Sequence, residues 1–202
     1  MTDYQTSAIH RPRQRAMRAH YDRATAHGIL DAGFVAHVAF MSETGPVAMP
    51  MFHVRDGESV LLHGSRTSRF MRVLSAGAPM CLTVTLIDGL VLAKSAFHHS
   101  MNYRSVMVHG QAALVPADEK LAALALFVER AQAGRSREAR APNAQELKAT
   151  DVLRLPLVEV VAKVRTGGPL DDAEDMALPV WTGVIPLELK PGAPVEWPGK
   201  AG

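Results

Sequence analysis

The chain is short of cysteine and has no long apolar run, and each shortage excludes a class of protein. Its 202 residues include one cysteine, Cys81, so an internal disulfide framework and a cysteine-rich zinc site are both excluded. No apolar run reaches the ~18 residues that span a bilayer. The first fifteen residues lack the apolar core of a secretory signal. We therefore expect a cytoplasmic protein without a membrane partner.

The chain also lacks an excess of charge of one sign. Its 22 lysines and arginines nearly balance 20 aspartates and glutamates, and aromatic residues make up only 5%. A nucleic-acid-binding module usually has a clustered basic excess and aromatic stacking platforms, so nucleic acid is not an expected partner. The apolar fraction of 48% and the net charge of +2 indicate an ordered globular protein.

Composition divides the chain into three parts. Residues 1–20 are polar and Arg-rich and predict a flexible arm, whose use in nucleic-acid binding is the weakest alternative considered. Residues 21–165 hold the periodic apolar patterns of a folded domain. Residues 166–202 are rich in Gly, Pro and Asp and predict an extended tail that packs on the domain or on a partner subunit.

Alternating apolar residues predict a mainly β protein with appended helices. Tight turns at 43–46, 55–58 and 88–89 join consecutive strands, which favours an antiparallel barrel over a parallel sheet. Helical spacing appears after Asp22, after Ser68 and over 118–131, and Asn143 with Glu146 fits a capping box. The six expected strands cover residues 34–40, 47–54, 59–63, 80–87, 103–115 and 152–164, with a further extended stretch at 90–93.

The segment HGSRTSR at 63–69 is the best candidate for binding a phosphate. It combines backbone N–H groups, short hydroxyl donors and two guanidinium groups before an expected helix, as a phosphate requires. A polar strand-to-helix loop with a hydroxyl N-cap explains the same residues, and spacing alone favours that simpler interpretation. No Walker motif and no strand-coupled GxGxxG is present. The residues are His63, Ser65, Arg66, Thr67, Ser68 and Arg69.

Other polar clusters give weaker predictions. His98 and His99 are adjacent, so in an extended chain they point to opposite faces, and no HxxxH pattern completes a metal site. We expect them to line a pocket or an interface and predict no metal. Cys81 lies in an apolar stretch and is expected to be a buried small side chain. The acidic run at 171–175 is expected to be a solvated turn, and Trp181 to anchor the tail rather than cover a planar ligand.

Five stretches of the chain stand out together: YDRAT (21–25), LLHGSRTSRFMR (61–72), CLTVTLIDGLVLAKSAFHHSMNYRSVMVHG (81–110), KATDVLRLP (148–156) and KVRTGGPLDDAEDMALPVWTGVIPL (163–187). In these stretches the chain resembles the flavin-nucleotide-binding proteins related to pyridoxamine 5'-phosphate oxidase, nearest to the branch of Nim-type nitroimidazole-resistance reductases. The resemblance implies a six-stranded antiparallel split β-barrel that forms a homodimer. It also implies two equivalent clefts between the subunits, each holding FMN.

The resemblance also implies roles for individual residues. The phosphate of FMN would be held by Ser65, Thr67, Ser68 and Arg69. The strand at 48–52, with Met49, Pro50, Met51 and Phe52, would run beside the isoalloxazine, and the backbone groups of Met49 and Met51 would face the ring. His63 would lie close to the flavin and is the candidate catalytic residue. The remaining implied flavin contacts are Thr83 on the cleft floor, Arg104, Ser105 and Trp181.

The function implied is that of an FMN-dependent oxidoreductase acting on a small-molecule substrate. Synthesis of pyridoxal phosphate is not expected, because no arginine follows Arg165 where the oxidases carry an Arg-rich segment. One alternative is a haem-binding or haem-degrading barrel with His63, His98 or His99 as axial ligand, since imidazole ligates haem iron well. Another is a non-catalytic flavin carrier or sensor. FAD or haem in place of FMN also stays open.

Overall fold

The computed structural model describes residues 3–9, 15–197 and 199, so part of the predicted arm, at 1–2 and 10–14, lies outside the described residues. The described part of the arm is not free. Tyr4 is only 5% exposed, and its hydroxyl hydrogen-bonds His27 Nε2 at 2.9 Å. Strand β1, Ala19–His20, pairs with β9, Glu159–Arg165. The buried tyrosine ring and the β1 pairing therefore hold these positions on the domain, and flexibility of the rest of the arm stays a prediction.

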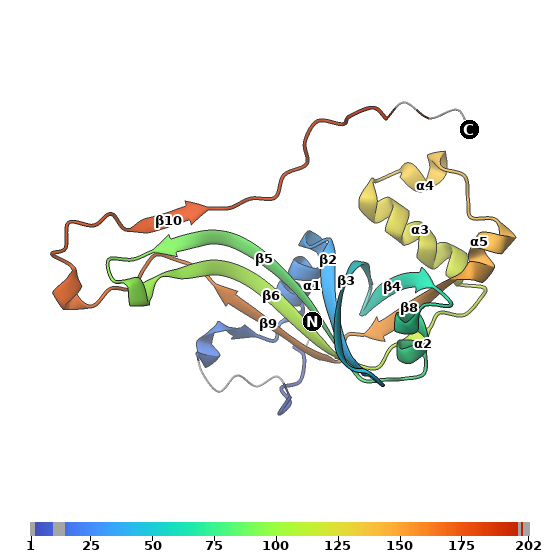
Figure 1. The fold of residues 1–202 in the computed structure, drawn as a ribbon, viewed down its shortest axis with the longest axis horizontal. Coiled ribbons are helices and arrows are strands. Elements are labelled where there is room, and N and C mark those ends of the chain that lie inside the picture. The colour runs from blue at the N-terminus through green and yellow to red at the C-terminus, as the bar shows by residue number, and fades with distance from the viewer. Residues whose placement is uncertain (1–2, 10–14, 198, 200–202) are drawn as a thin grey trace. The chain divides into compact units, whose positions relative to one another are not determined.

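The described strands form a sheet whose pairings are antiparallel, in the order β1-β9-β6-β5-β2-β3-β4-β8-β7, with β10 paired to β5 (Figure 1). This confirms the prediction of a mainly antiparallel β fold with appended helices. The longer strands are β2 Val35–Ser42, β3 Gly45–Asp56, β4 Ser59–Ser65, β5 Met80–Leu92, β6 Ser100–Gly110, β8 Thr150–Pro156 and β9 Glu159–Arg165; the short ones are β1, β7 Ala113–Leu114 and β10 Gly183–Pro186.

Side-chain caps start the helices where the sequence predicted them. The carboxylate of Asp22 accepts from Thr25 N at 2.8 Å, Ser68 Oγ accepts from Met71 N at 3.2 Å, and Asn143 with Glu146 forms the predicted capping box. The α-helices are α1 Arg23–Ala32, α2 Arg69–Ser75, α3 Lys120–Ala131, α4 Arg135–Glu138 and α5 Ala144–Ala149; short 3₁₀ turns span Ala16–Arg18, Ala96–His98 and Ala173–Asp175.

Two strand predictions were wrong. The Asp88-Gly89 pair makes no turn, because β5 runs unbroken through it. Gly89 is needed there for close approach: a Cβ at this position would lie 2.8 Å from Val184 Cγ1 on the paired β10. The stretch 152–164 is two strands, β8 and β9, and β8 ends at Pro156 because proline has no N–H for the ladder.

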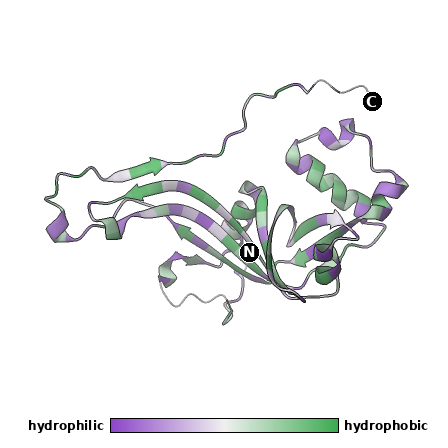
Figure 2. Ribbon diagram, viewed as in Figure 1, coloured by the Kyte–Doolittle hydropathy of each residue, from purple (hydrophilic) through white to green (hydrophobic). Residues whose placement is uncertain are grey.

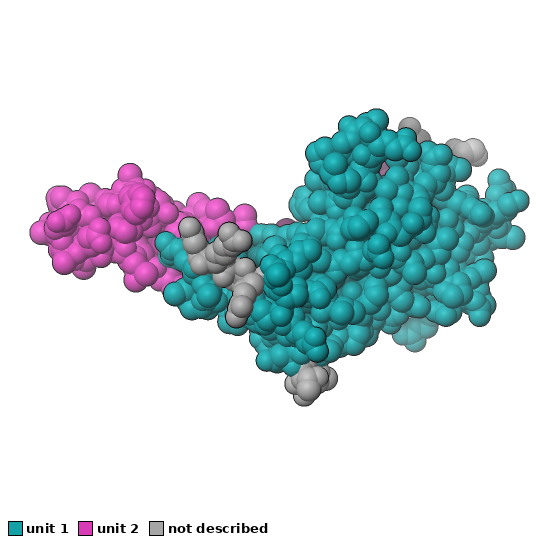
Figure 3. Space-filling view, turned by 90° about the horizontal axis from the view of Figure 1, so that it is seen from below, with its two compact units in different colours: residues 1–86, 103–165 teal, residues 87–102, 166–202 magenta. Residues whose placement is uncertain are grey.

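The described residues divide into two compact units, coloured separately in Figure 3. The first comprises residues 1–86 and 103–165, and the second comprises 87–102 and 166–202. The tail thus forms a unit with the β5–β6 connection rather than standing alone. In the first unit, α3 covers a small apolar cluster, and green apolar residues run along α3 and β4 in Figure 2. That cluster consists of Val54, Leu61, Val115, Ala123, Phe127 and Val152.

Strand β2 shows how the pleat separates a core face from an outer face. Ala36, Val38 and Phe40 are at most 6% exposed and belong to the main core, whereas His37 and Ala39 between them are exposed. This is the predicted period of two. Among the described residues, no helix is long and apolar enough to cross a membrane.

Candidate functional site

Strand β3 changes its pairing partner along its length, and this opens a split in the sheet. Residues 45–52 pair with β2, whereas residues 53–56 pair with β4. Beyond the His53–Leu62 pair, β4 continues to Ser65 beside β8. The edge of β3 from residue 45 to residue 52 therefore faces no strand within the described residues. Backbone groups on such an edge need another hydrogen-bonding partner.

Prolines identify which backbone groups face the split. The turn between β2 and β3 has two residues, so the Ser42–Gly45 pair that closes it is hydrogen-bonded. From this pair onward, alternate residues of β3 exchange backbone hydrogen bonds with β2. Pro46 and Pro50 fall on the intervening positions, where a missing N–H costs the ladder nothing. Ala48 lies two residues from each proline and so belongs to the same alternate set of β3. Its N–H and C=O therefore point away from β2 and into the split.

The same register corrects one prediction. The backbone groups of Met49 and Met51 were expected to face a flavin ring. Both residues fall on the hydrogen-bonded positions of the β2–β3 ladder, so their backbone groups point toward β2. Their side chains pack against the main core instead. The split-facing backbone groups belong to Ala48, Pro50 and Phe52.

Residues 65–69 lie at the open end of the split and bring the predicted phosphate-binding hydroxyls together. Ser65 Oγ and Thr67 Oγ1 are 3.1 Å apart, and both side chains are exposed. Arg69 Nη1 donates to Thr44 Oγ1 in the β2–β3 turn at 3.2 Å. A guanidinium beside exposed hydroxyls suits a phosphate. Ser68 is half-buried, and its oxygen is already used as the cap of α2.

A cavity of about 650 Å³ adjoins this loop between the β2–β3 turn and α2. Its polar rim carries the guanidinium groups of Arg69 and Arg72 together with the hydroxyl of Thr44. Both arginines are exposed. The cavity is thus electropositive along the α2 side, with Glu43 at the turn.

His63 points away from the core to the side covered by α3. Its ring meets Phe127 edge-on, with centroids 4.5 Å apart, and Phe52 contacts the same phenyl ring at 5.9 Å. Burial lowers the pKa of His63 below its usual value. The residue lines a cavity of about 500 Å³ whose wall is mostly apolar side chains of α3. Sequence reasoning placed His63 near a ligand but missed this cavity.

The outer face of β3, β2 and β5 carries rows of side chains that lie opposite one another across the three strands. His37 lies directly between Pro50 and Thr83, and Ala39 lies between Ala48 and Cys81. Thr83, predicted as a cleft floor, is half-buried on this face.

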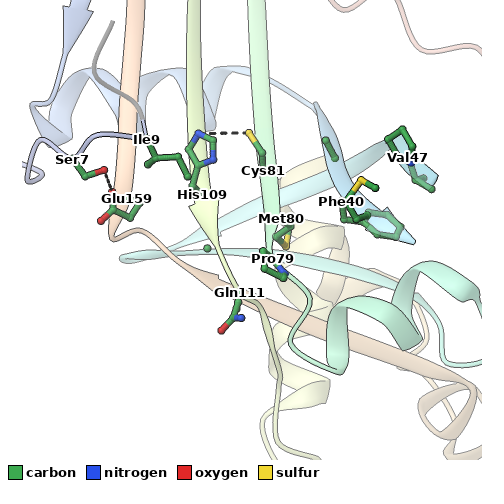
Figure 4. A pocket seen from close by; sticks show the side chains of 14 residues that line it. Ser7, Ile9, Phe40, Val47, Pro79, Met80, Cys81, His109, Gln111 and Glu159 are labelled. Atoms are coloured by element: carbon green, nitrogen blue, oxygen red, sulfur yellow. Dashed lines mark hydrogen bonds between the residues drawn. The ribbon is translucent and has the colours of Figure 1, made fainter. Parts of the chain in front are cut away.

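The same face is hollowed by a cavity of about 800 Å³ (Figure 4). Cys81 Sγ lies 3.8 Å from His109 Nε2, and both residues line the hollow. The prediction of a buried Cys81 was wrong, since its position in the pleat alternates with the core residues Met80 and Leu82.

Arg104 and Ser105 lie on β6, apart from the split. In the sheet order, β5 and β2 stand between β6 and β3. Ser105 is 9% exposed and its hydroxyl donates to Lys163 O at 3.4 Å. Within one chain, these two residues and the 65–69 loop therefore do not form one continuous site along the sheet.

The second unit holds the remaining predicted residues. His98 Nε2 lies 3.1 Å from Asp172 Oδ2, and His99 Nδ1 donates to Ser95 O at 3.0 Å. Asp171 accepts from the backbone of Lys94 at 2.8 Å, so the acidic run is an organised turn rather than a purely solvated one. Trp181 is 64% exposed, so the prediction that it anchors the tail was wrong. Among the described residues, no group of three or more His, Cys, Asp or Glu is arranged to hold a metal ion.

Comparisons with known proteins identify the family. The model of the pyridoxamine 5'-phosphate oxidase family matches residues 22–164. The flavocytochrome Anf3 from Azotobacter vinelandii is 40% identical, with a TM-score of 0.91 over 95% of this chain and 90% of that one. An FAD- and haem-binding protein from Mycobacterium smegmatis is 35% identical, with a TM-score of 0.87 over 91% of both chains. A search of curated proteins gave no match.

A putative 5-nitroimidazole antibiotic resistance protein from Bacteroides thetaiotaomicron is more distant. It is 18% identical, with a TM-score of 0.61 over 72% of this chain and 86% of that one, and shares the fold. The predicted family is confirmed, whereas the two flavin- and haem-related proteins are nearer in sequence than this nitroimidazole-resistance protein.

Proposed function

Because the chain belongs to the pyridoxamine 5'-phosphate oxidase family, we propose that it is a redox protein that binds a flavin nucleotide and a haem. One observation carries the proposal: similarity to a flavocytochrome and to an FAD- and haem-binding protein extends over nine-tenths or more of both chains in each case. The haem alternative from the sequence thus has stronger support than the Nim-type reductase. When bound, a flavin supplies one- and two-electron redox chemistry, and haem iron supplies one-electron chemistry.

The split fits a flavin ring along the edge of β3. Backbone N–H and C=O of Ala48 and the C=O of Pro50 face it, so a flat ligand with donors and acceptors on its rim can extend the strand pairing. The hydroxyls of Ser65 and Thr67 and the guanidinium of Arg69 bind the phosphate at the open end. These residues bind and orient the flavin, and no acid or base is needed for that role.

FAD is the proposed nucleotide rather than FMN. FAD has a second phosphate and an adenosine, which need room beyond the first phosphate site. The cavity of about 650 Å³ beside Arg69 supplies that room, and Arg72 on its rim supplies a second cation. The relative from Mycobacterium smegmatis binds FAD.

A homodimer completes the proposed site. The outer face of β2, β3 and β5 exposes apolar side chains, including Val35 at 48% and Met41 at 65%. A twofold partner would cover this face. It would also bring a second copy of Arg104 and Ser105 toward the split, which the sheet order keeps apart within one chain.

An FMN-dependent oxidoreductase acting on a small molecule is the second candidate. The family match over residues 22–164 favours it, because that segment contains the split and the 65–69 loop. In this case haem would be absent from the purified protein.

Purified protein distinguishes the two candidates. The absorption spectrum should show flavin bands and a Soret band, each near one equivalent per chain, and extraction of the cofactor should release FAD. Flavin without haem, even after haem titration, would favour the second candidate. Protein with neither cofactor and no affinity for either would overturn both.

A further inference from the structure

We propose that the haem binds in the cavity between β4 and α3, with the imidazole of His63 as an axial ligand to the iron. This inference rests on the haem half of the proposed function and assigns it a site. The cavity lies wholly within the first unit, where β4, β8 and α3 pack together. It lies on the α3 side of β4, the same side as Leu61 in the apolar cluster under α3.

The cavity has the size and lining of a cofactor pocket. Its volume is about 500 Å³, within the usual ~300–1,000 Å³ for pockets that bury a small molecule. Its lining comes from the apolar face of α3 and from the chain between α4 and α5. A porphyrin ring needs such apolar walls, because its flat surface is mostly hydrocarbon. The apolar lining residues are Leu121, Leu124, Ala125, Phe127, Val128, Ala139, Ala141 and Pro142.

His63 is placed as a ligand at the base of this cavity. It is the histidine among the lining residues, and its ring is held edge-on against Phe127. Within the described part of the chain, neither ring nitrogen has a hydrogen-bond partner. A nitrogen is therefore available for iron without breaking an existing bond. The other proposed axial ligands, His98 and His99, hydrogen-bond within the second unit and do not line this cavity.

Polar residues gather at the rim, where the haem propionates would emerge. Arg140 lines the cavity and its side chain is 68% exposed. Its guanidinium donates to Ala141 O and to both carboxylate oxygens of Glu146, which uses three of the five guanidinium N–H groups. Donors therefore remain for a propionate. The hydroxyl of Thr150 lines the cavity as well.

The cavity and the flavin split meet at the end of β4. Thr150, which lines the cavity, is the strand partner of Ser65 in the proposed phosphate loop. Phe52 at the end of the split contacts the same Phe127 ring as His63. Two cofactors in these positions would lie on neighbouring sides of one strand, which suits transfer of electrons between them.

The test compares His63→Ala with the wild type as purified and after haem titration, using His20→Ala as the matched control. We expect His63→Ala to lose haem stoichiometry at least tenfold, with FAD content unchanged. His20→Ala should keep both. In His63→Gly, added imidazole should restore the Soret band, as it replaces the missing ligand.

A second variant tests the cavity without touching the ligand. Leu124→Trp fills the space, so it should also lose haem while keeping its flavin and its far-ultraviolet circular dichroism. A wild type that binds no haem would overturn the haem half of the proposed function. A His63→Ala variant that keeps an unchanged Soret band and stoichiometry would overturn the axial-ligand assignment alone, as would loss of haem only in His98→Ala or His99→Ala.

Discussion

Arg69 Nη1 donates to Thr44 Oγ1 over 3.2 Å, which ties the start of α2 to the β2–β3 turn. The two elements are 25 residues apart in sequence, and each borders the proposed nucleotide site. The contact positions the guanidinium at the open end of the split, beside Ser65 and Thr67. It also shows that one side chain serves both the fold and the proposed phosphate site.

Substitution of this arginine should weaken binding of any flavin nucleotide. Arg69→Ala removes a charge-assisted contact to the first phosphate, worth about 1.5–3 kcal/mol, so the Kd for FMN and FAD should each rise at least tenfold. Arg72→Ala should weaken FAD but leave FMN within about twofold, because in the proposed site Arg72 would face only the second phosphate of FAD. Quenching of flavin fluorescence measures both constants. Equal effects of Arg72→Ala on the two nucleotides would contradict the assignment of FAD to the α2 cavity.

The backbone N–H of Ala48 can be tested without altering the ladder. Ala48→Pro removes a donor that faces the split, so flavin affinity should fall about five- to tenfold while the melting temperature stays close to wild type. Met49→Pro is the matched control, since its N–H faces β2 and its loss should cost about 3 kcal/mol of stability or more. If Ala48→Pro unfolds as readily as Met49→Pro, the parity assigned to β3 is wrong.

Alanine substitutions at two glycines, one in α1 and one just after it, should change the stability of the fold in opposite directions. A Cβ on Gly33 would lie 2.3 Å from Val84 Cγ1, whereas one on Gly28 in α1 would meet nothing within 4 Å. Gly33→Ala should therefore destabilise by about 1–3 kcal/mol through overpacking. Gly28→Ala should stabilise by about 0.5–1 kcal/mol, because glycine is a poor helix residue. Urea titrations of both variants measure the difference, and a stable Gly33→Ala would contradict the close packing of α1 on β5.

Stability should fall in mild acid because His53 is buried. Its side chain is fully buried, Nε2 donates to Leu30 O at 3.0 Å, and Nδ1 has no partner among the described residues. Burial lowers the pKa of His53, so the folded protein resists protonation, while the unfolded chain takes up a proton near pH 6.5. The contribution of neutral His53 to the free energy of unfolding is constant above about pH 7. It is lost as the pH falls below ~6.5, at up to ~1.4 kcal/mol per pH unit.

Urea unfolding at pH 7.5 and pH 5.5 measures this loss. His53→Gln keeps a donor toward Leu30 and cannot titrate, so it should lose less stability between the two pH values than the wild type. The pH dependence of stability should be smaller in His53→Gln than in the wild type but should not disappear, since burial also lowers the pKa of His27. An equal loss in variant and wild type would show that His53 is not the responsible group.

The local elements and the family could be predicted from the amino-acid sequence alone. Alternation placed β2, β3 and β4, and caps at Asp22, Ser68 and Asn143 placed helix starts, because these signals act within a few residues of the chain. The stretches at 21–25, 61–72, 81–110, 148–156 and 163–187 indicate the family, and Pro46 and Pro50 mark positions of β3 that have no N–H to donate to β2.

The positions of the proposed sites depend on contacts between segments that are far apart in the chain. The split exists because β3 exchanges β2 for β4 as its neighbour, and no local pattern encodes which strand lies beside which. The same holds for the cavity at His63, which needs β4, α3 and the α4–α5 connection brought together from residues 63 to 150. Gly89 is the clearest example. The dipeptide Asp88-Gly89 favours a turn, but it lies within β5 because β10, nearly a hundred residues away, pairs with it there. Close packing between distant strands outweighs a dipeptide preference.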